Sequence, residues 1–142
     1  MKSPPLHVVA PLALALGCAT AYGQICSSEK FESPDSQQEF LAHHYGLIVH
    51  LDVDAEYAHF LQATHFVEGQ SEAQRQDLLR DQVKILTAAK EQRLAGTRFH
   101  IDANLELGPD VVIRVQEWQD VCELARNPHV KFIWFNRPIH LT

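Results

Sequence analysis

The sequence predicts an α+β fold: an antiparallel four-stranded sheet with two helices on one face. Four stretches have the hydrophobic pattern of strands, two have the apolar stripe of an amphipathic helix, and they occur in the order βαββαβ. With 46% hydrophobic and 21% charged residues, the composition is that of a globular chain. A length of 142 residues suits one compact domain with a modest core.

The first strand is predicted over residues 45–53. Leucine and valine alternate with other residues from Leu47 to Val53, and a period of two indicates a strand that buries one face. Residues 54–70 show no clear period, so we expect a loop with some helical character there.

A long amphipathic helix follows this loop. Ser71 and Gln74 have the spacing of a capping box, in which each side chain accepts a hydrogen bond from the backbone N–H of the other residue. Gly96 is placed to end the helix. Between these signals, apolar residues recur every three or four positions, as in a helix that buries one stripe. That stripe consists of Leu79, Val83, Leu86 and Ala89, widened by Leu78 and Ile85.

The next two strands are short. We expect the second strand over residues 97–101, a turn region over residues 105–109, and the third strand over residues 111–115. Gly108 and Pro109 favour the turn because both residues are common in tight connections.

The second helix and the last strand complete the order. Apolar residues recur with helical spacing from Trp118 to Ala125, and Pro128 cannot continue a helix. Residues 130–135 are hydrophobic almost throughout, which indicates a central strand. An antiparallel sheet with this βαββαβ order is the ferredoxin-like, or split βαβ, arrangement.

The first 23 residues are typical of an export signal. Lys2 supplies a short positive end, residues 8–16 are mostly apolar, and small residues near the end offer a cleavage site. Because the apolar run is shorter than the roughly 20 residues of a membrane span, we expect a periplasmic or secreted protein with no membrane partner after cleavage. Lipid attachment at Cys18 stays open as an alternative.

Residues 24–44 are polar and predict an N-terminal linker. After removal of the signal, Cys26 and Cys122 remain, and two cysteines in an oxidising compartment commonly form a disulfide. Such a bond would tie the linker to the domain. The alternative is a buried thiol at Cys122 with Cys26 free.

Charge and residue types argue against several functions. The net charge of −6, without a basic stripe, argues against a nucleic-acid partner. Nine histidines occur, but no HExxH or CxxC spacing accompanies them, so we expect no metal site or cofactor. No nucleophile elbow is recognisable, and we expect no catalytic residue and no enzyme.

Three stretches carry a resemblance to a known family. They are the first strand at residues 46–51, the helix entry at residues 67–71 with Gln74 and Arg75, and the ending at residues 124–130 followed by Asn136 and Arg137. By their order and spacing, residues 45–142 resemble the propeptide domain of subtilisin-like serine proteases. Polar residues 102–104 depart from the usual end of the second strand in that family.

The resemblance implies inhibition without catalysis. In that family the outer sheet face packs against two surface helices of the protease, and the C-terminal tail lies in the active-site cleft as a product would. The tail would be held by strand addition. Carried onto this sequence, Ile139, His140, Leu141 and Thr142 would fill the four non-primed subsites, with Ile139 in the deep apolar pocket and Thr142 at the catalytic serine.

Two further sets of residues are candidates for contact with such a protease. Of the two faces of the last strand, we expect Lys131, Ile133 and Phe135 to dock, because Lys131 is the residue least suited to burial. Glu106 and Asp110 are candidates to cap the N-termini of the partner's helices.

A catalytic domain of the subtilisin class does not fit within 142 residues. We therefore expect an inhibitor that acts on a separately encoded subtilisin-like protease. Two alternatives stay open: a folding chaperone that acts in trans on such a protease, and a ferredoxin-like module that binds a small ligand or its own copies through the sheet.

Overall fold

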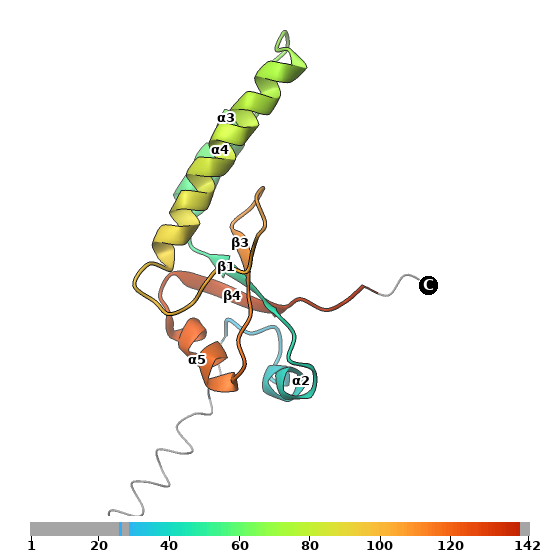
Figure 1. Ribbon diagram of the computed structural model, residues 1–142, viewed down its shortest axis with the longest axis vertical. Coiled ribbons are helices and arrows are strands. Elements are labelled where there is room, and N and C mark those ends of the chain that lie inside the picture. The colour runs from blue at the N-terminus through green and yellow to red at the C-terminus, as the bar shows by residue number, and fades with distance from the viewer. Residues whose placement is uncertain (1–25, 27–28, 140–142) are drawn as a thin grey trace, which may run out of the picture.

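The computed structural model describes Cys26 and residues 29–139, and these residues form an α+β fold around one four-stranded sheet. The order of strands in the sheet is β2-β3-β1-β4, and every neighbouring pair is antiparallel. The predicted α+β class with a four-stranded antiparallel sheet is thus confirmed. Along the described chain the elements are α2 (Ser36–His43), β1 (Leu47–Leu51), α3 (Asp54–Ala63), α4 (Glu72–Arg93), β2 (Ala103–Asn104), β3 (Asp110–Ile113), α5 (Trp118–Arg126) and β4 (Val130–Phe135) (Figure 1).

The export signal predicted over residues 1–23, and with it Cys18, lies outside the described residues.

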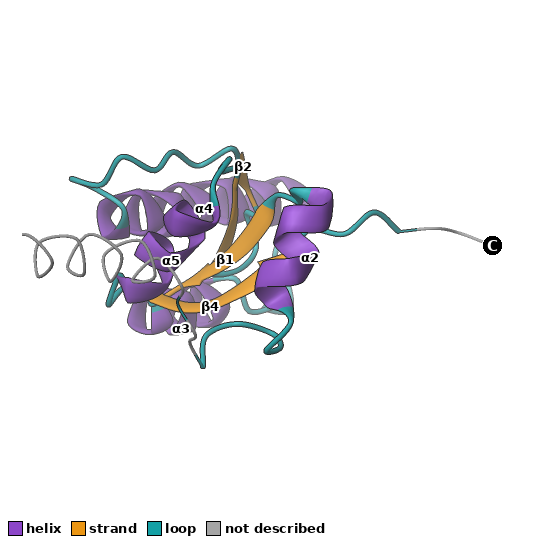
Figure 2. Ribbon diagram, turned by 90° about the horizontal axis from the view of Figure 1, so that it is seen from below, coloured by secondary structure: helices purple, strands orange, loops and turns teal. Residues whose placement is uncertain are grey.

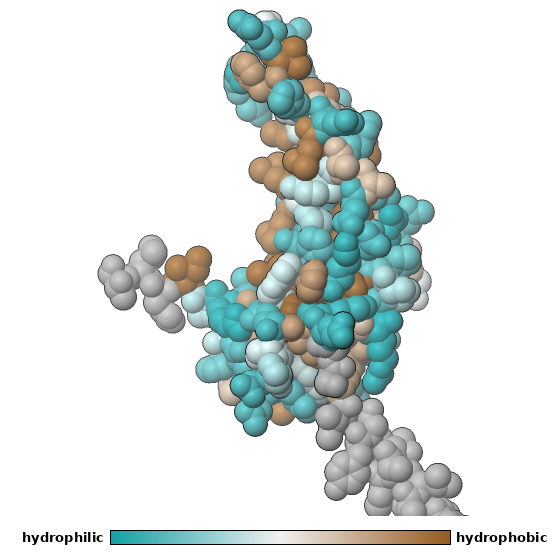
Figure 3. Space-filling model, turned by 180° about the vertical axis from the view of Figure 1, so that it is seen from behind, coloured by the Kyte–Doolittle hydropathy of each residue, from teal (hydrophilic) through white to brown (hydrophobic). Residues whose placement is uncertain are grey.

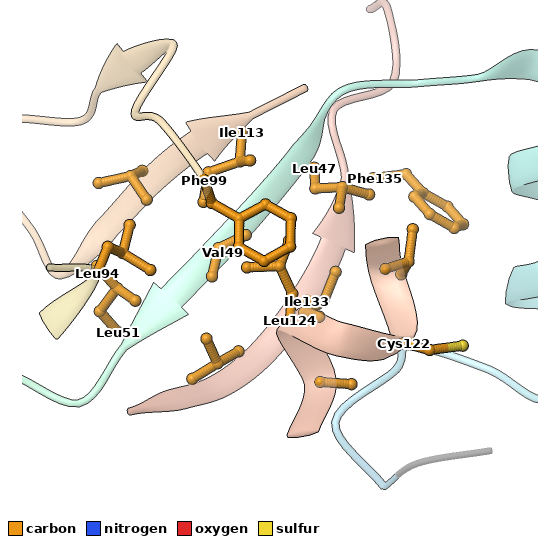
Figure 4. Close-up of a cluster of buried hydrophobic side chains, with 14 of the residues drawn as sticks. Leu47, Val49, Leu51, Leu94, Phe99, Ile113, Cys122, Leu124, Ile133 and Phe135 are labelled. Carbon is orange, nitrogen blue, oxygen red and sulfur yellow. The ribbon is translucent and has the colours of Figure 1, made fainter. Parts of the chain in front are cut away.

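Strand β1 lies between β3 and β4 and supplies the centre of the core. Its alternate side chains Leu47, Val49 and Leu51 are completely buried, as the period of two predicted. Val49 lies opposite Val111 on β3 and Ile133 on β4. These inward side chains form one cluster with Leu94, directly after α4, and with Leu124 of α5 (Figure 4).

Helices α3 and α4 form a hairpin that projects from the rest of the molecule (Figure 1). Both bonds of the predicted capping box are present: Gln74 N donates to Ser71 Oγ at 3.1 Å, and Ser71 N donates to Gln74 Oε1 at 2.9 Å. At 1.5 Å per residue, α4 is about 33 Å long, so only its C-terminal part reaches the sheet. Leu86 is buried there, whereas Ile85 is exposed and does not widen the buried stripe as predicted.

Residues 54–63, predicted as part of a loop with some helical character, form the regular helix α3. The helix was hard to recognise because its apolar face is short: of its side chains only Phe60 is buried. An ion pair of 2.6 Å between Glu56 and Arg93 joins α3 to the end of α4, and Arg93 Nε also donates to the carbonyl oxygen of Asp52.

Two strand predictions are wrong. The second strand lies at β2, and residues 97–101 are not part of it; pairing with β3 begins where Asp102 N donates to the carbonyl of Val112. The polar residues 102–104 therefore pair at the sheet edge, while Phe99 turns into the core. Strand β4 is at the other end of the sheet and is not central.

Residues 29–44 pack against the domain and are not a linker. Phe31 forms a parallel bridge with Ile133, whose backbone N–H donates to the carbonyl of Lys30 at 2.9 Å. The Phe135 N–H donates to the Glu32 carboxylate at 2.7 Å. Phe40 of α2 is completely buried. This N-terminal segment covers the outer edge of β4, which explains how a strand with hydrophobic residues on both faces lies at the end of the sheet.

The predicted disulfide between Cys26 and Cys122 is present in the structure. It joins the N-terminal segment to α5, which itself packs against β4. Helix α2 contacts α5 as well, and the view from below shows both helices in front of strands β1 and β4 (Figure 2).

Candidate functional site

The outer face of the sheet carries two large exposed aromatic side chains. Phe132 and Trp134 lie on β4, pointing away from the core; they are 46% and 36% exposed. Their rings stack with centroids 5.8 Å apart. Across the strand pair, Phe132 lies opposite His50 and Trp134 opposite Ile48.

His50 completes this cluster and is oriented from both sides. Its ring makes T-shaped contacts with Phe132 and Trp134, with centroids 6.3 and 5.9 Å away. Its Nδ1 lies 2.8 Å from Oδ1 of Asp110 on the neighbouring strand β3. We call His50, Phe132 and Trp134 the aromatic face. Rings held together in this way form a preformed surface that can be buried against a partner at little cost in side-chain entropy.

The expected docking face of Lys131, Ile133 and Phe135 is wrong. Ile133 and Phe135 are in the core, only 2% and 7% exposed. Lys131 does not share one exposed face with Ile133 and Phe135, because the register of the strand pair shifts between His50 and Leu51. Leu51 lies opposite Val130. Lys131 is thus the extra residue of a bulge. Its ammonium group pairs with Asp54 at 2.7 Å and stays near the solvent.

The chain leaves the sheet at Asn136, whose N–H donates to the carbonyl of Gly46 at 2.8 Å. Of the predicted tail residues, Ile139 is described and is 85% exposed, and the described chain after β4 leads away from the body of the molecule (Figures 1 and 3). His140, Leu141 and Thr142 lie outside the described residues.

Arg137 is anchored at the start of this tail, and the sequence did not predict its role. Its guanidinium donates to the Glu39 carboxylate at 2.5 and 2.8 Å and to Glu32 at 2.7 and 3.3 Å. It also lies over the ring of Phe135, 5.4 Å from the centroid. The hydrogen bond from Arg137 holds the pKa of Glu39 below its usual value. The acidic residues Glu32 and Glu39 were the only sequence signal for a partner of Arg137, but the polar segment that contains them resembled a linker.

The two helix-capping candidates differ in their surroundings. Glu106 lies on the exposed connection between β2 and β3, at a shallow hollow that Lys84 and Leu107 also line. Asp110, at the start of β3, has its carboxylate engaged with His50 and so belongs to the setting of the aromatic face.

Lys90 is a completely buried lysine behind the same connection. Its ammonium group donates to the carbonyl oxygens of Leu105, Gly108 and Asp110 at 3.0, 2.8 and 3.2 Å. Burial lowers the pKa of Lys90 to about 8. The sequence carried a signal for this site, because Lys90 follows Leu86 by four residues and so continues the apolar stripe of α4.

Among the described residues, no group of three histidine, cysteine, aspartate or glutamate side chains is placed to hold a metal ion. Within that same part of the chain, no helix has the length and apolar character needed to cross a membrane. Comparison with protein-family models, with curated proteins and with solved structures finds no match for this chain.

Proposed function

We propose that this protein is an exported inhibitor of a subtilisin-like serine protease. The observation that carries the proposal is the position of β4. Its outward side chains, Phe132 and Trp134, belong to the exposed aromatic face, and its C-terminal end leads within four residues to Ile139, which is 85% exposed. One strand would thus connect a docking surface with a segment free to enter an active-site cleft.

The proposal includes a ferredoxin-like arrangement of the fold. The sheet order β2-β3-β1-β4 with antiparallel neighbours supports it. So does the shared cluster in which side chains of α4 and α5 pack with the inward residues of the sheet. Helices α2 and α3 would be additions to the two helices of that arrangement.

Two kinds of contact would supply the affinity. Burial of Phe132 and Trp134 against the protease surface would form the centre of the docking contact, since buried aromatic side chains dominate many interfaces. The tail would add as a strand in the cleft, with Ile139, His140, Leu141 and Thr142 in the non-primed subsites. The aromatic face thus replaces Lys131, Ile133 and Phe135 as the proposed docking residues.

Inhibition assays test the proposal directly. We expect the purified protein to inhibit a subtilisin competitively and to leave a chymotrypsin-fold protease of similar specificity uninhibited. Trp134→Asp should weaken inhibition at least about a hundredfold, roughly 2.7 kcal/mol, because a charge would replace a central apolar contact. Its circular dichroism and melting temperature should stay near those of the wild type, since Trp134 is outside the core.

Ile85→Asp is the matched control, because Ile85 is an exposed apolar residue on α4. It should inhibit as the wild type does. Full inhibition by folded Trp134→Asp would contradict docking through the aromatic face. Equal potency against both protease classes would contradict the proposed mechanism.

Self-association through the sheet is a second candidate, because an exposed stacked aromatic pair can also pack against a second copy. Sedimentation of the wild type and Trp134→Asp distinguishes the two functions. A dimer that Trp134→Asp dissociates, without any protease inhibition, would favour self-association. Slow cleavage of the inhibitor by the protease it has helped to fold would instead favour the trans-acting chaperone.

A further inference from the structure

Arg137 lies where the last strand becomes the tail and is held by residues from the other end of the chain. Glu32 belongs to the N-terminal segment that covers β4, and Glu39 belongs to α2. Four hydrogen bonds of 2.5–3.3 Å join the guanidinium to these two carboxylates. Both carboxylates therefore fix one side chain, two residues before Ile139.

The two carboxylates are themselves attached to the domain at several points. Glu32 accepts a hydrogen bond from the backbone N–H of Phe135. Glu39 precedes Phe40, whose completely buried ring holds α2 in place. The disulfide at Cys26 joins the same segment to α5. The guanidinium is thus bound to a rigid part of the molecule rather than to two freely moving side chains.

We propose that Arg137 is a positioning residue: Glu32 and Glu39 hold it so that the tail leaves β4 in one direction. This inference rests on the proposed function, and it makes the N-terminal segment a part of the inhibitory apparatus. The region that resembles a propeptide begins at Tyr45, so the resemblance did not imply such a role.

Fixing the start of the tail would act mainly on binding. Arg137 is partly exposed, and exposed ion pairs contribute little to the stability of a fold. A tail with a fixed starting direction, however, loses less conformational entropy when it enters a cleft, and preorganisation of this kind raises affinity. If Arg137 served only the stability of the fold, its replacement would destabilise the protein and would weaken inhibition equally with and without the tail.

The first arm of the test uses the purified exported protein without any protease. We expect the heteronuclear ¹⁵N NOE of the Ile139 amide to fall to less than half its wild-type value in Arg137→Gln and in the double variant Glu32→Gln/Glu39→Gln. Arg126→Gln, which removes an exposed arginine at the end of α5, should leave the NOE unchanged. An unchanged NOE in Arg137→Gln would overturn the positioning role.

The second arm measures inhibition of a subtilisin in two backgrounds. Arg137→Gln should raise the inhibition constant about tenfold when the tail is complete and less than twofold when residues 139–142 are deleted. An equal rise in both backgrounds would show that Arg137 does not act through the tail, and would overturn the inference. If the wild type inhibits no subtilisin, the proposed function is wrong, and the NOE arm alone decides whether Arg137 positions the tail.

Discussion

Lys90 shows how one residue can hold a connection together. Two backbone carbonyls of the β2–β3 connection and that of Asp110, the first residue of β3, converge on its ammonium group, and no water-exposed surface remains on the side chain. Without that donor, the carbonyl of Gly108 would lose the bond to Lys90, and the carbonyls of Leu105 and Asp110 would each keep only a backbone N–H donor. A polar group left without its hydrogen bond costs about 1–3 kcal/mol. The residue therefore links α4 to the β2–β3 side of the sheet through hydrogen bonds rather than through apolar contact.

Lys90→Met should lower the free energy of unfolding at pH 7 by about 2–4 kcal/mol, because the thioether fills the space but cannot donate to the carbonyls. Urea denaturation followed by circular dichroism measures this loss. Lys84→Met is the control, since Lys84 is an exposed lysine on the same helix, and it should change stability little. Equal stability of the two variants would contradict the role of Lys90.

The same lysine gives stability a particular pH dependence. Its folded pKa is about 8, while the ordinary value is 10.5. Between these two values the unfolded chain binds the proton and the folded protein does not, so the contribution of Lys90 to stability rises with pH across this window. The difference in free energy of unfolding between the wild type and Lys90→Met, measured by denaturation, should therefore increase from pH 7.5 to pH 10.5. A difference that stays constant or falls would contradict the lowered pKa.

At the scale of elements, hydrophobic period and capping predicted the strands and helices with long or strong patterns. The alternation around Val49 identified β1, and the capping box at Ser71 identified the start of α4. Helix α5 and strand β4 also lie close to their predicted positions. In each case one face of the element enters the core, so the period in the sequence is the period of burial.

The elements that were missed depend on tertiary contacts. Strand β2 has only two residues and lies at the edge of the sheet, where it is held by backbone hydrogen bonds. It therefore shows no hydrophobic alternation. The N-terminal segment is held by Phe31, Phe40 and a disulfide within otherwise polar sequence. The sequence predicted the wrong docking face because it placed Lys131 and Ile133 on one exposed face. The register shift between His50 and Leu51 interrupts the alternation there, and the sequence has no signal for that shift.

The capping box at the start of α4 makes a separate prediction. Ser71→Ala should lower the free energy of unfolding by about 1 kcal/mol, because the N–H of Gln74 loses its acceptor. Hydrogen exchange at the Gln74 amide should become faster, while the amide of Val49 keeps its relative protection. Glu68→Ala, an exposed change in the connection before the helix, serves as the control. Unchanged exchange at Gln74 in Ser71→Ala would exclude a stabilising cap.

At the scale of the whole molecule, the disulfide closes a long loop, since Cys26 and Cys122 are 96 positions apart in the sequence. Cys26→Ser/Cys122→Ser should lower the free energy of unfolding by about 2–5 kcal/mol, because the unfolded chain gains conformational freedom. Urea denaturation measures this loss of stability. In the wild type, mass spectrometry after thiol alkylation should find neither Cys26 nor Cys122 labelled. Labelling of both thiols without reductant would contradict the bond.

The N-terminal segment on the edge of β4 also bears on how this chain folds. The hydrogen bond between Lys30 and Ile133 joins residues about 100 positions apart, so it forms only after a large part of the chain has been brought together. Until then, β4 presents an unpaired backbone edge with aromatic side chains beside it, a combination that favours pairing with other chains. A chain in which this edge is still open would therefore aggregate more readily than the folded protein, and the N-terminal segment removes that risk when it closes the edge.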